Sequence, residues 1–202
     1  MIERNLTQPR YDFSRRGTGL SLSEVLIAAA VMLVITVTAF PNVVTVVSNA
    51  RLYASMTTLS GIVQTGRLQA VKLNRTMSVH MTAEPHGLIG YVKQAPDGSG
   101  LRTTDSEVQL QVPIARMAAP SGWGAPTALD NTTLGFTPEA GDASFNSRGA
   151  SCSYSGGNCT SRGFLYYFKD ARTVGDSGWA ALSISPGGRV KKWFWIDSTW
   201  TD

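Results

Sequence analysis

The chain has 202 residues, of which 43% are hydrophobic and 16% are charged, and its formal net charge is +4. This length accommodates one ordinary domain and an additional segment. Five tryptophans, six tyrosines and seven phenylalanines supply enough apolar surface for a core, which excludes a wholly disordered chain. A net charge this small is weak evidence for an anionic partner, so such a partner has to be argued from local clusters of charge.

The N-terminal part contains a long apolar segment, because residues 25–40 carry no charge. As a helix, Leu20–Phe40 would be about 30 Å long, the thickness of a bilayer core. Arg15 and Arg16 precede it, so the positive-inside rule predicts a cytoplasmic N-terminus and an exported C-terminal domain. A secretory signal peptide fits poorly, because its apolar region is about 7–15 residues long. A plain anchor leaves Glu24 unexplained, since a carboxylate in hydrocarbon costs about 2.5–3.5 kcal/mol.

The residues around this segment resemble the type IV prepilin processing site. The matching run is Arg15-Arg16-Gly17-Thr18-Gly19-Leu20-Ser21-Leu22-Ser23-Glu24. In that family a dedicated prepilin peptidase cuts after a glycine, and a glutamate is the fifth residue of the mature chain. Gly19, Leu20 and Glu24 occupy these places, although Leu20 replaces the commoner phenylalanine and Ser23 replaces an aliphatic residue.

The resemblance implies a role for Glu24. Cleavage after Gly19 would free the α-amino group of Leu20, which is usually methylated in the family, and Glu24 of a neighbouring subunit would pair with this amine. Such pairing offsets the cost of burying the charge. The implied location is the bacterial inner membrane, crossed once, with a periplasmic C-terminal domain that reaches a filament or the cell surface after assembly.

The segment beyond the anchor predicts a second helical half that ends near Asn74. Apolar or small residues recur there at steps of three and four, which is typical of an amphipathic helix. They are Leu52, Met56, Leu59, Val63, Gly66, Ala70 and Leu73. Gly66 would allow a close approach to a sheet. Pro41 stands where many pilins have a helix-kinking proline, and it is expected to bend or loosen the helix.

The remainder predicts β-strands separated by turns. Strand patterns occur at 77–82, 87–93, 106–112, 162–168, 179–185 and 189–195. Pro186-Gly187-Gly188 predicts a hairpin between the last two, and 113–130 a long loop. No crossover helix intervenes, so the sheet should be mostly antiparallel.

The predicted fold class is therefore α+β and pilin-like, with a long N-terminal helix, half transmembrane and half amphipathic, packed on a mostly antiparallel β-sheet head. The predicted organisation is a cleaved leader (1–19), a transmembrane or filament-core helix (20–41), the amphipathic half of the helix (42–75) and a β-rich periplasmic head (76–202).

Three segments of the head resemble the GspH/FimT family of minor pilins and pseudopilins. They are Gln69-Ala-Val-Lys-Leu-Asn-Arg75, Phe145-Asn-Ser-Arg-Gly149 and Ile184-Ser-Pro-Gly-Gly-Arg-Val190. The resemblance implies a non-enzymatic subunit that assembles with other pilins or pseudopilins into a type IV pilus or a related filament. The alternative is a purely structural, priming pseudopilin of a type II secretion system with no nucleic-acid ligand.

Two cysteines, Cys152 and Cys159, lie seven positions apart in a run rich in glycine and serine. This spacing permits a disulfide in an oxidising compartment, and the alternative is a pair of free thiols. A metal site is not predicted, because two cysteines cannot complete a tetrahedral set and neither His80 nor His86 is near in sequence.

No catalytic residue or cofactor is predicted. Gly175-Asp-Ser-Gly178 is similar to the nucleophile segment of trypsin-like proteases, but four residues are a weak match, and the chain lacks that family's Ala-Ala-His-Cys segment. Catalysis would also require a positioned histidine and an orienting acid.

Basic residues near the C-terminus suggest double-stranded DNA as a further partner. Arg189, Lys191 and Lys192 lie beside three tryptophans, and cations bind phosphates while exposed aromatic rings stack on bases. Some FimT-type proteins are implicated in DNA uptake through a Gly-Arg-x-Arg motif, which Gly188-Arg189-Val190-Lys191 resembles. Arg148, Arg162 and Arg172 could extend the patch. The alternative is that these charges are solvated and protect a sheet edge, with the tryptophans in the core.

Overall fold

The computed structural model describes residues 21–84, 87–95, 107–110, 114–120, 134–173, 178–196 and 198–202, and only the backbone of 38–42, 84 and 107–109. The chain divides into two compact units, Met1–Asn42 and Val43–Asp202. Helix α1 is assigned to Leu22–Leu73, so its first part belongs to the first unit and its second part to the second unit, which we call the head.

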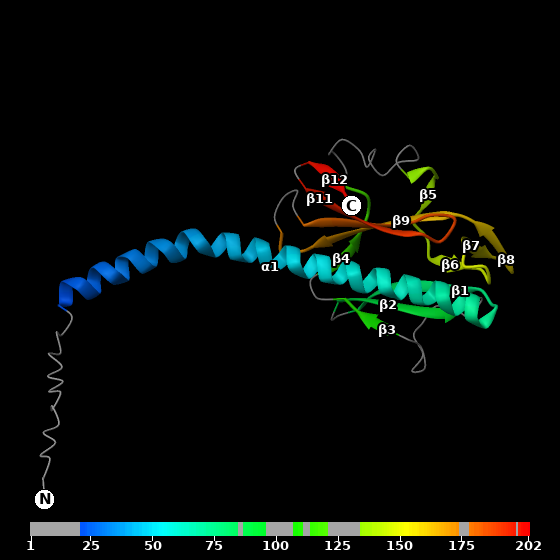
Figure 1. Ribbon diagram of the computed structural model, residues 1–202, viewed down its shortest axis with the longest axis horizontal. Helices are drawn as coiled ribbons and strands as arrows, with labels where there is room; N and C mark the ends of the chain where they lie inside the picture. Colours follow the sequence, from blue (N-terminus) through cyan, green and yellow to red (C-terminus); the bar gives the residue numbers. More distant parts are fainter. Residues whose placement is uncertain are drawn as a thin grey trace, which may run out of the picture. The chain divides into compact units, whose positions relative to one another are not determined.

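The head contains two β-sheets (Figure 1). The first sheet has the order β3-β2-β1-β6-β7-β8 and the second has the order β12-β11-β10-β9-β4, with β5 added beside β9. The strands of the first sheet are β1 (Met77–Glu84), β2 (Gly87–Gln94), β3 (Glu107–Gln109), β6 (Ala143–Phe145), β7 (Ser151–Ser155) and β8 (Asn158–Ser161). Those of the second are β4 (Ile114–Met117), β5 (Pro138–Glu139), β9 (Gly163–Asp170), β10 (Trp179–Ile184), β11 (Val190–Ile196) and β12 (Thr199–Thr201).

The predicted fold class needs correction in its head and in its membrane segment. The head was expected to hold one sheet, but the strands form two, both built from antiparallel neighbours except for the parallel pair β5 and β9. The strands divide into two sheets because their hydrogen-bonded neighbours differ. β1 pairs with β2 and β6, whereas β10 pairs with β9 and β11. The predicted loop at 113–130 is also partly wrong, because β4 lies within it.

The predicted transmembrane half and the single-pass inner-membrane location are corrected as well. Among the residues whose side chains are described, no helix is both long and apolar enough to cross a membrane.

Helix α1 begins with a capping box formed by Ser21 and Glu24. The backbone N–H of Ser21 donates to Oε2 of Glu24 (2.8 Å), and the backbone N–H of Glu24 donates to Oγ of Ser21 (3.2 Å). This reciprocal pair satisfies two backbone donors that a helix start otherwise leaves without a partner. Glu24 therefore has a local structural role that the sequence analysis did not assign to it.

The helix ends at Leu73 through a Schellman motif. Asn74 adopts a positive φ of 50°, and the N–H groups of Asn74 and Arg75 donate to the carbonyls of Val71 and Ala70 (3.3 and 3.1 Å). Asparagine tolerates this left-handed conformation better than most residues. The predicted end signal at Asn74 is confirmed.

The second part of α1 packs into a core that includes residues of both sheets. Every residue of the predicted stripe is buried except Leu73, which is 52% exposed. A Cβ at Gly66 would lie 2.8 Å from Cγ2 of Val79, so the absent side chain lets α1 approach β1 closely, as predicted. In Figure 1 this part of α1 runs alongside β1 and β2.

The second sheet buries apolar side chains on both faces. Phe164, Tyr166 and Phe168 belong to the core that includes α1, whereas Leu165 and Tyr167 belong to a second cluster with Trp179, Trp193 and Trp200. All residues of β10 are buried because apolar side chains cover both faces of this sheet. Burial raises the pKa of Tyr167 to about 12, which keeps this phenol protonated at physiological pH.

A disulfide closes the hairpin of β7 and β8. Cys152 and Cys159 are bonded, with their Cα atoms 5.4 Å apart, so the predicted pairing is confirmed. The two strands pair in antiparallel register, and the disulfide constrains the far edge of the first sheet.

Within the head, a buried polar contact fixes α1 to the end of β9. Asp170 is fully buried, the hydroxyl of Ser48 donates to its Oδ2, and the backbone N–H of Arg172 donates to its Oδ1 (2.9 Å). A buried carboxylate requires such donors, because desolvation without them is costly.

Asp170→Ala should lower the free energy of unfolding by about 1–3 kcal/mol, because it leaves the buried Ser48 hydroxyl without its acceptor. The measurement is urea unfolding followed by circular dichroism. Asp202→Ala is the matched control, since it removes an exposed aspartate. Equal unfolding free energies for both variants and the wild type would contradict this role of Asp170.

Candidate functional site

Two arginine-bearing turns meet in the head. We call residues 146–149 the Arg148 turn and residues 185–189 the Arg189 turn. In the first, Oδ1 of Asn146 accepts the backbone N–H groups of Arg148 (3.0 Å) and Ala150 (3.1 Å). In the second, the N–H of Gly188 donates to the carbonyl of Ser185 (2.8 Å). This turn joins β10 to β11, which confirms the hairpin predicted at Pro186-Gly187-Gly188.

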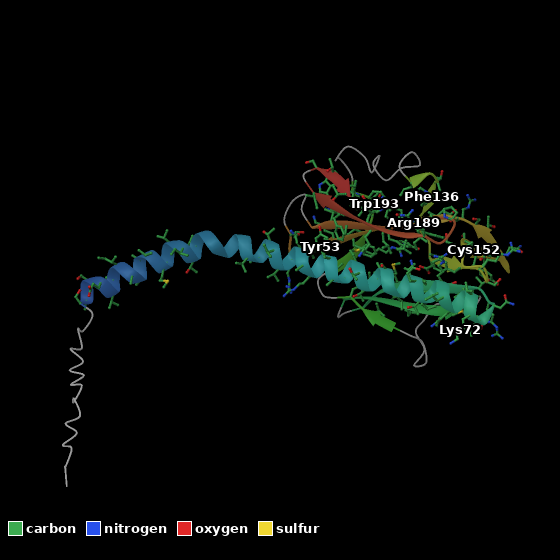
Figure 2. The ribbon with its side chains drawn as sticks, viewed as in Figure 1. Tyr53, Lys72, Phe136, Cys152, Arg189 and Trp193 are labelled. Carbon is green, nitrogen blue, oxygen red and sulfur yellow. A yellow bond between two sulfur atoms is a disulfide. The ribbon has the colours of Figure 1, made fainter. Side chains whose placement is uncertain are left out.

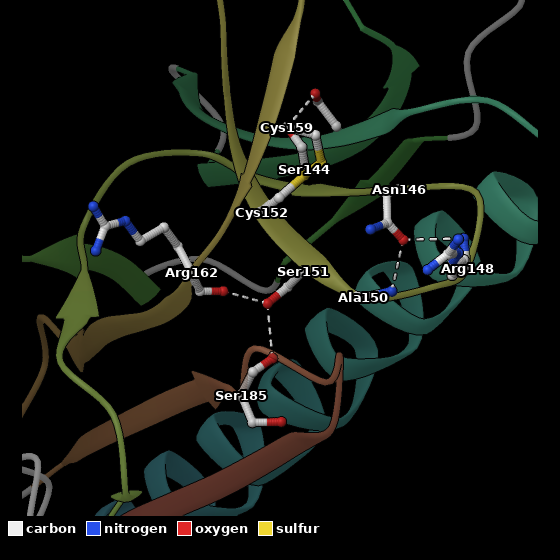
Figure 3. Close-up of a disulfide and its surroundings, with 10 residues drawn as sticks. Ser144, Asn146, Arg148, Ala150, Ser151, Cys152, Cys159, Arg162 and Ser185 are labelled. Carbon is white, nitrogen blue, oxygen red and sulfur yellow. Dashed lines mark hydrogen bonds between the residues drawn. A yellow bond between two sulfur atoms is a disulfide. The ribbon is translucent and has the colours of Figure 1, made fainter.

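Ser151 connects the two turns. Its backbone N–H donates to the carbonyl of Pro186 (3.0 Å). Its hydroxyl lies 2.7 Å from the carbonyl oxygen of Ser185 and 2.5 Å from that of Arg162, so these two acceptors share its single O–H proton. Ser151 is fully buried, so these bonds are shielded from water. Figure 3 shows Ser151 between Ser185 and Arg162, close to the Arg148 turn.

Two glycines allow the turns to touch. Gly149 and Gly188 have φ angles of 76° and 78°, a region that strains other residues. A Cβ on Gly188 would collide with the carbonyl oxygen of Gly149. Nε of Arg67 donates to this same carbonyl (3.0 Å), so α1 is joined to the contact between the turns.

The turns and the end of α1 assemble a group of cations, which we call the basic end cluster: Arg67, Lys72, Arg148 and Arg189. Arg67, Lys72 and Arg148 line a hollow of about 590 Å³ together with Gln64, Leu68 and Val71. Arg189 follows Gly188 in the adjoining turn, and Arg148 and Arg189 are both exposed. Within the described part of the chain, no member of the cluster forms an ion pair.

The other predicted DNA-binding cations either bind a neighbouring side chain or lie outside the basic end cluster. Nε of Arg162 is 3.1 Å from Oε1 of Glu139, and Nζ of Lys191 is 2.5 Å from Oδ2 of Asp202. The hydrogen bond from Lys191 lowers the pKa of the Asp202 carboxyl. Lys192 donates to Oγ1 of Thr57 (3.3 Å), and Arg172 is exposed in the segment between β9 and β10.

The tryptophans near the C-terminus are not free stacking platforms. Trp193 and Trp200 are buried in the second apolar cluster, and Nε1 of Trp193 donates to Oγ of Ser183 (2.8 Å). Trp195 packs against this cluster and contacts the ring of Trp200. Nζ of Lys191 lies 4.1 Å from the centre of the Trp193 ring. The alternative prediction, that the tryptophans lie in the core, is therefore correct for Trp193 and Trp200.

The predicted DNA-binding residues included Arg148 and Arg189 but not Arg67 and Lys72. A signal was present, because α1 carries basic residues but no acid between Val25 and Leu73. The sequence did not show that the end of α1 lies beside the two turns. Figure 2 places Lys72, Cys152 and Arg189 toward one end of the head and Tyr53 toward the other.

The predicted processing residues are only partly described. Gly19 and Leu20 lie outside the described residues, and Glu24 occupies the capping box of α1. His86 and residues 174–177, which include most of the protease-like segment, also lie outside them. His80 forms a pair with Asp142 (Nδ1–Oδ2, 2.8 Å). Among the described residues, no group of three histidines, cysteines or acids could hold a metal ion.

Gly188→Ala should lower the free energy of unfolding by about 1–3 kcal/mol, because the new Cβ strains a positive φ and forces the two turns apart. Gly187→Ala is the matched control, since its Cβ would meet only Oγ of Ser185 at 3.9 Å. Urea unfolding measures both variants, and indistinguishable stabilities would refute the tight contact between the turns.

The site is thus a group of cations assembled from α1 and two rigid turns, and none of them forms an ion pair with a described acid. This arrangement suits the binding of an anion. Comparisons with protein-family models, with curated proteins and with solved structures found no match to this chain.

Proposed function

We propose that this chain is a subunit of a type IV pilus-like filament, a minor pilin or pseudopilin, that assembles with other pilins after cleavage by a prepilin peptidase. One observation carries the proposal: every described side chain from Ser21 to Val37 is exposed, although most are apolar. The resemblance of Arg15–Glu24 to a prepilin processing site supports the same conclusion.

The first part of α1 requires a partner that covers apolar surface on all its sides. Leu22, Met32 and Leu33 are 81%, 68% and 66% exposed. A helix that is apolar all round is stable only when other apolar groups enclose it. Equivalent helices of neighbouring subunits provide such an enclosure in a filament core.

Glu24 then has two separable roles. Its carboxylate accepts the Ser21 N–H in the capping box, and a glutamine can do the same. In a filament its negative charge would also pair with the freed amino group of Leu20 in a neighbouring subunit, which offsets the cost of burying the charge. Only the second role depends on ionisation.

Glu24→Gln should therefore preserve the helix start but reduce incorporation into filaments at least tenfold, because a neutral amide cannot neutralise the amine. The measurement is the amount of subunit in filaments sheared from the native bacterium, with N-terminal sequencing to establish that cleavage still follows Gly19.

Ser21→Ala is the matched control, because it removes half of the capping box and keeps the charge. It should assemble as the wild type does. Wild-type incorporation of Glu24→Gln would overturn the pairing and leave Glu24 as a helix cap alone.

We further propose that the basic end cluster binds the phosphate backbone of double-stranded DNA. The observation that favours this second function is the rigid juxtaposition of the Arg148 and Arg189 turns, which presents two exposed guanidinium groups beside Arg67 and Lys72. Arginine binds phosphate through a fixed fork of donors. Such contacts carry no base specificity.

The double variant Arg148→Gln/Arg189→Gln should weaken DNA retardation and reduce the slope of log affinity against log salt by about two, one for each lost phosphate contact. The full-length chain is titrated with duplex DNA at several salt concentrations.

The matched control is Arg162→Gln/Lys191→Gln, which removes the same charge from two residues that already pair with Glu139 and Asp202. Its salt slope should stay near that of the wild type. Equal losses in both double variants would indicate a net-charge effect, and this result, like an absence of retardation at low salt, refutes a DNA site at the two turns.

A further inference from the structure

The head contains an apolar cavity that neither proposed function uses. Its volume is about 710 Å³, within the range of about 300–1,000 Å³ that is typical of small-molecule sites. It lies between the end of the β1–β2 hairpin and the edge strand β4, and residues of β9 also line it. The described residues that form its apolar wall include Met81, Leu88, Ile114, Met117 and Leu165.

Arg116 is the charged residue among those described that line this cavity. Its guanidinium carbon lies 4.7 Å from the centre of the Tyr166 ring, and Nη2 donates to the carbonyl of Ala140. In the described part of the chain Arg116 forms no ion pair with a carboxylate. A guanidinium has five N–H donors, so this contact leaves donors free for an anion.

The neighbouring tyrosines carry no negative charge that could pair with Arg116 in place of a ligand. The hydroxyl of Tyr166 donates to the carbonyl of Gly141 (2.7 Å), and burial raises the pKa of both Tyr166 and Tyr167. Both phenols are neutral at physiological pH, and both tyrosines are among the residues that line the cavity. Among the described residues, the cavity combines a large apolar surface with one cation that forms no ion pair.

We propose that this cavity binds a single-chain amphipathic carboxylate, a fatty-acid-like ligand whose acyl chain occupies the apolar part and whose carboxylate pairs with Arg116. An apolar wall of this size matches an acyl chain, because each buried CH₂ contributes about 0.8 kcal/mol. A carboxylate matches Arg116 because the two groups form charge-assisted, bidentate hydrogen bonds.

The test uses a thiol placed in the cavity of the full-length chain. The chain's two cysteines form a disulfide, so Met117→Cys introduces a single reactive group at a residue that lines the cavity and is 46% exposed. Dodecanoate should slow the reaction of this thiol with a maleimide in a saturable manner. Val46→Cys, on an exposed part of α1, is the matched control and should react at an unchanged rate.

Arg116→Gln tests the charge. In the Met117→Cys background it should raise the dodecanoate concentration required for half-protection at least tenfold, because it removes a charge-assisted pair. Protection by dodecanol, which has the same chain and no charge, should change by less than threefold. Arg116→Lys should restore most of the dodecanoate affinity, whereas Arg189→Gln, in the basic end cluster, should have no effect.

Three results would overturn the proposal: no protection of Met117→Cys by dodecanoate, equal protection of Val46→Cys, or equal half-protection with and without Arg116→Gln. Should Arg116→Gln fail to fold, the comparison of dodecanoate with dodecanol on the Met117→Cys chain decides it. Dodecanol that protects as well as dodecanoate then refutes a role for the carboxylate.

Discussion

The close approach of α1 to the first sheet, which the missing side chain of Gly66 permits, organises the head. A Cβ at Gly66 would collide with Val79, so no larger residue lets the helix lie this close to β1. The approach buries Leu52, Met56 and Leu59 in a core that also includes residues of the second sheet. Buried side chains of this size stabilise a fold by about 1.5–3 kcal/mol each. The Ser48–Asp170 contact adds a directional bond near the other end of the packed helix, which fixes its register along the sheets.

The same packing creates the basic end cluster. Once α1 lies against β1, its last turns reach the Arg148 and Arg189 turns, where Arg67 donates to the Gly149 carbonyl. Residues from three distant parts of the chain thereby present their cations together. Rigidity matters here, because backbone bonds and two positive-φ glycines hold the turns before any ligand binds. A preorganised group loses less conformational entropy on binding than flexible surface lysines would.

Glu24 shows how one side chain can satisfy two physical demands. In the isolated chain it completes a capping box with Ser21, and in the proposed filament its charge also compensates an amino group of a neighbouring subunit. The first role needs only a hydrogen-bond acceptor, whereas the second needs a negative charge. Arg116 in the apolar cavity differs from Glu24 in this respect. Its positive charge has no carboxylate partner among the described residues.

Local signals in the sequence by themselves determined the stripe from Leu52 to Ala70, the helix end at Asn74, the hairpin at Pro186-Gly187-Gly188 and the bond between Cys152 and Cys159. Each depends on residues within a few positions of one another, so periodicity and turn chemistry sufficed. The capping box was equally readable, because Ser21-x-x-Glu24 is its pattern. Only the tertiary structure decided the division into two sheets, the burial of Trp193 and Trp200, and the position of the Arg148 and Arg189 turns beside Arg67. These features depend on pairing between distant strands and on which face of each strand is covered, and a linear pattern does not contain that information.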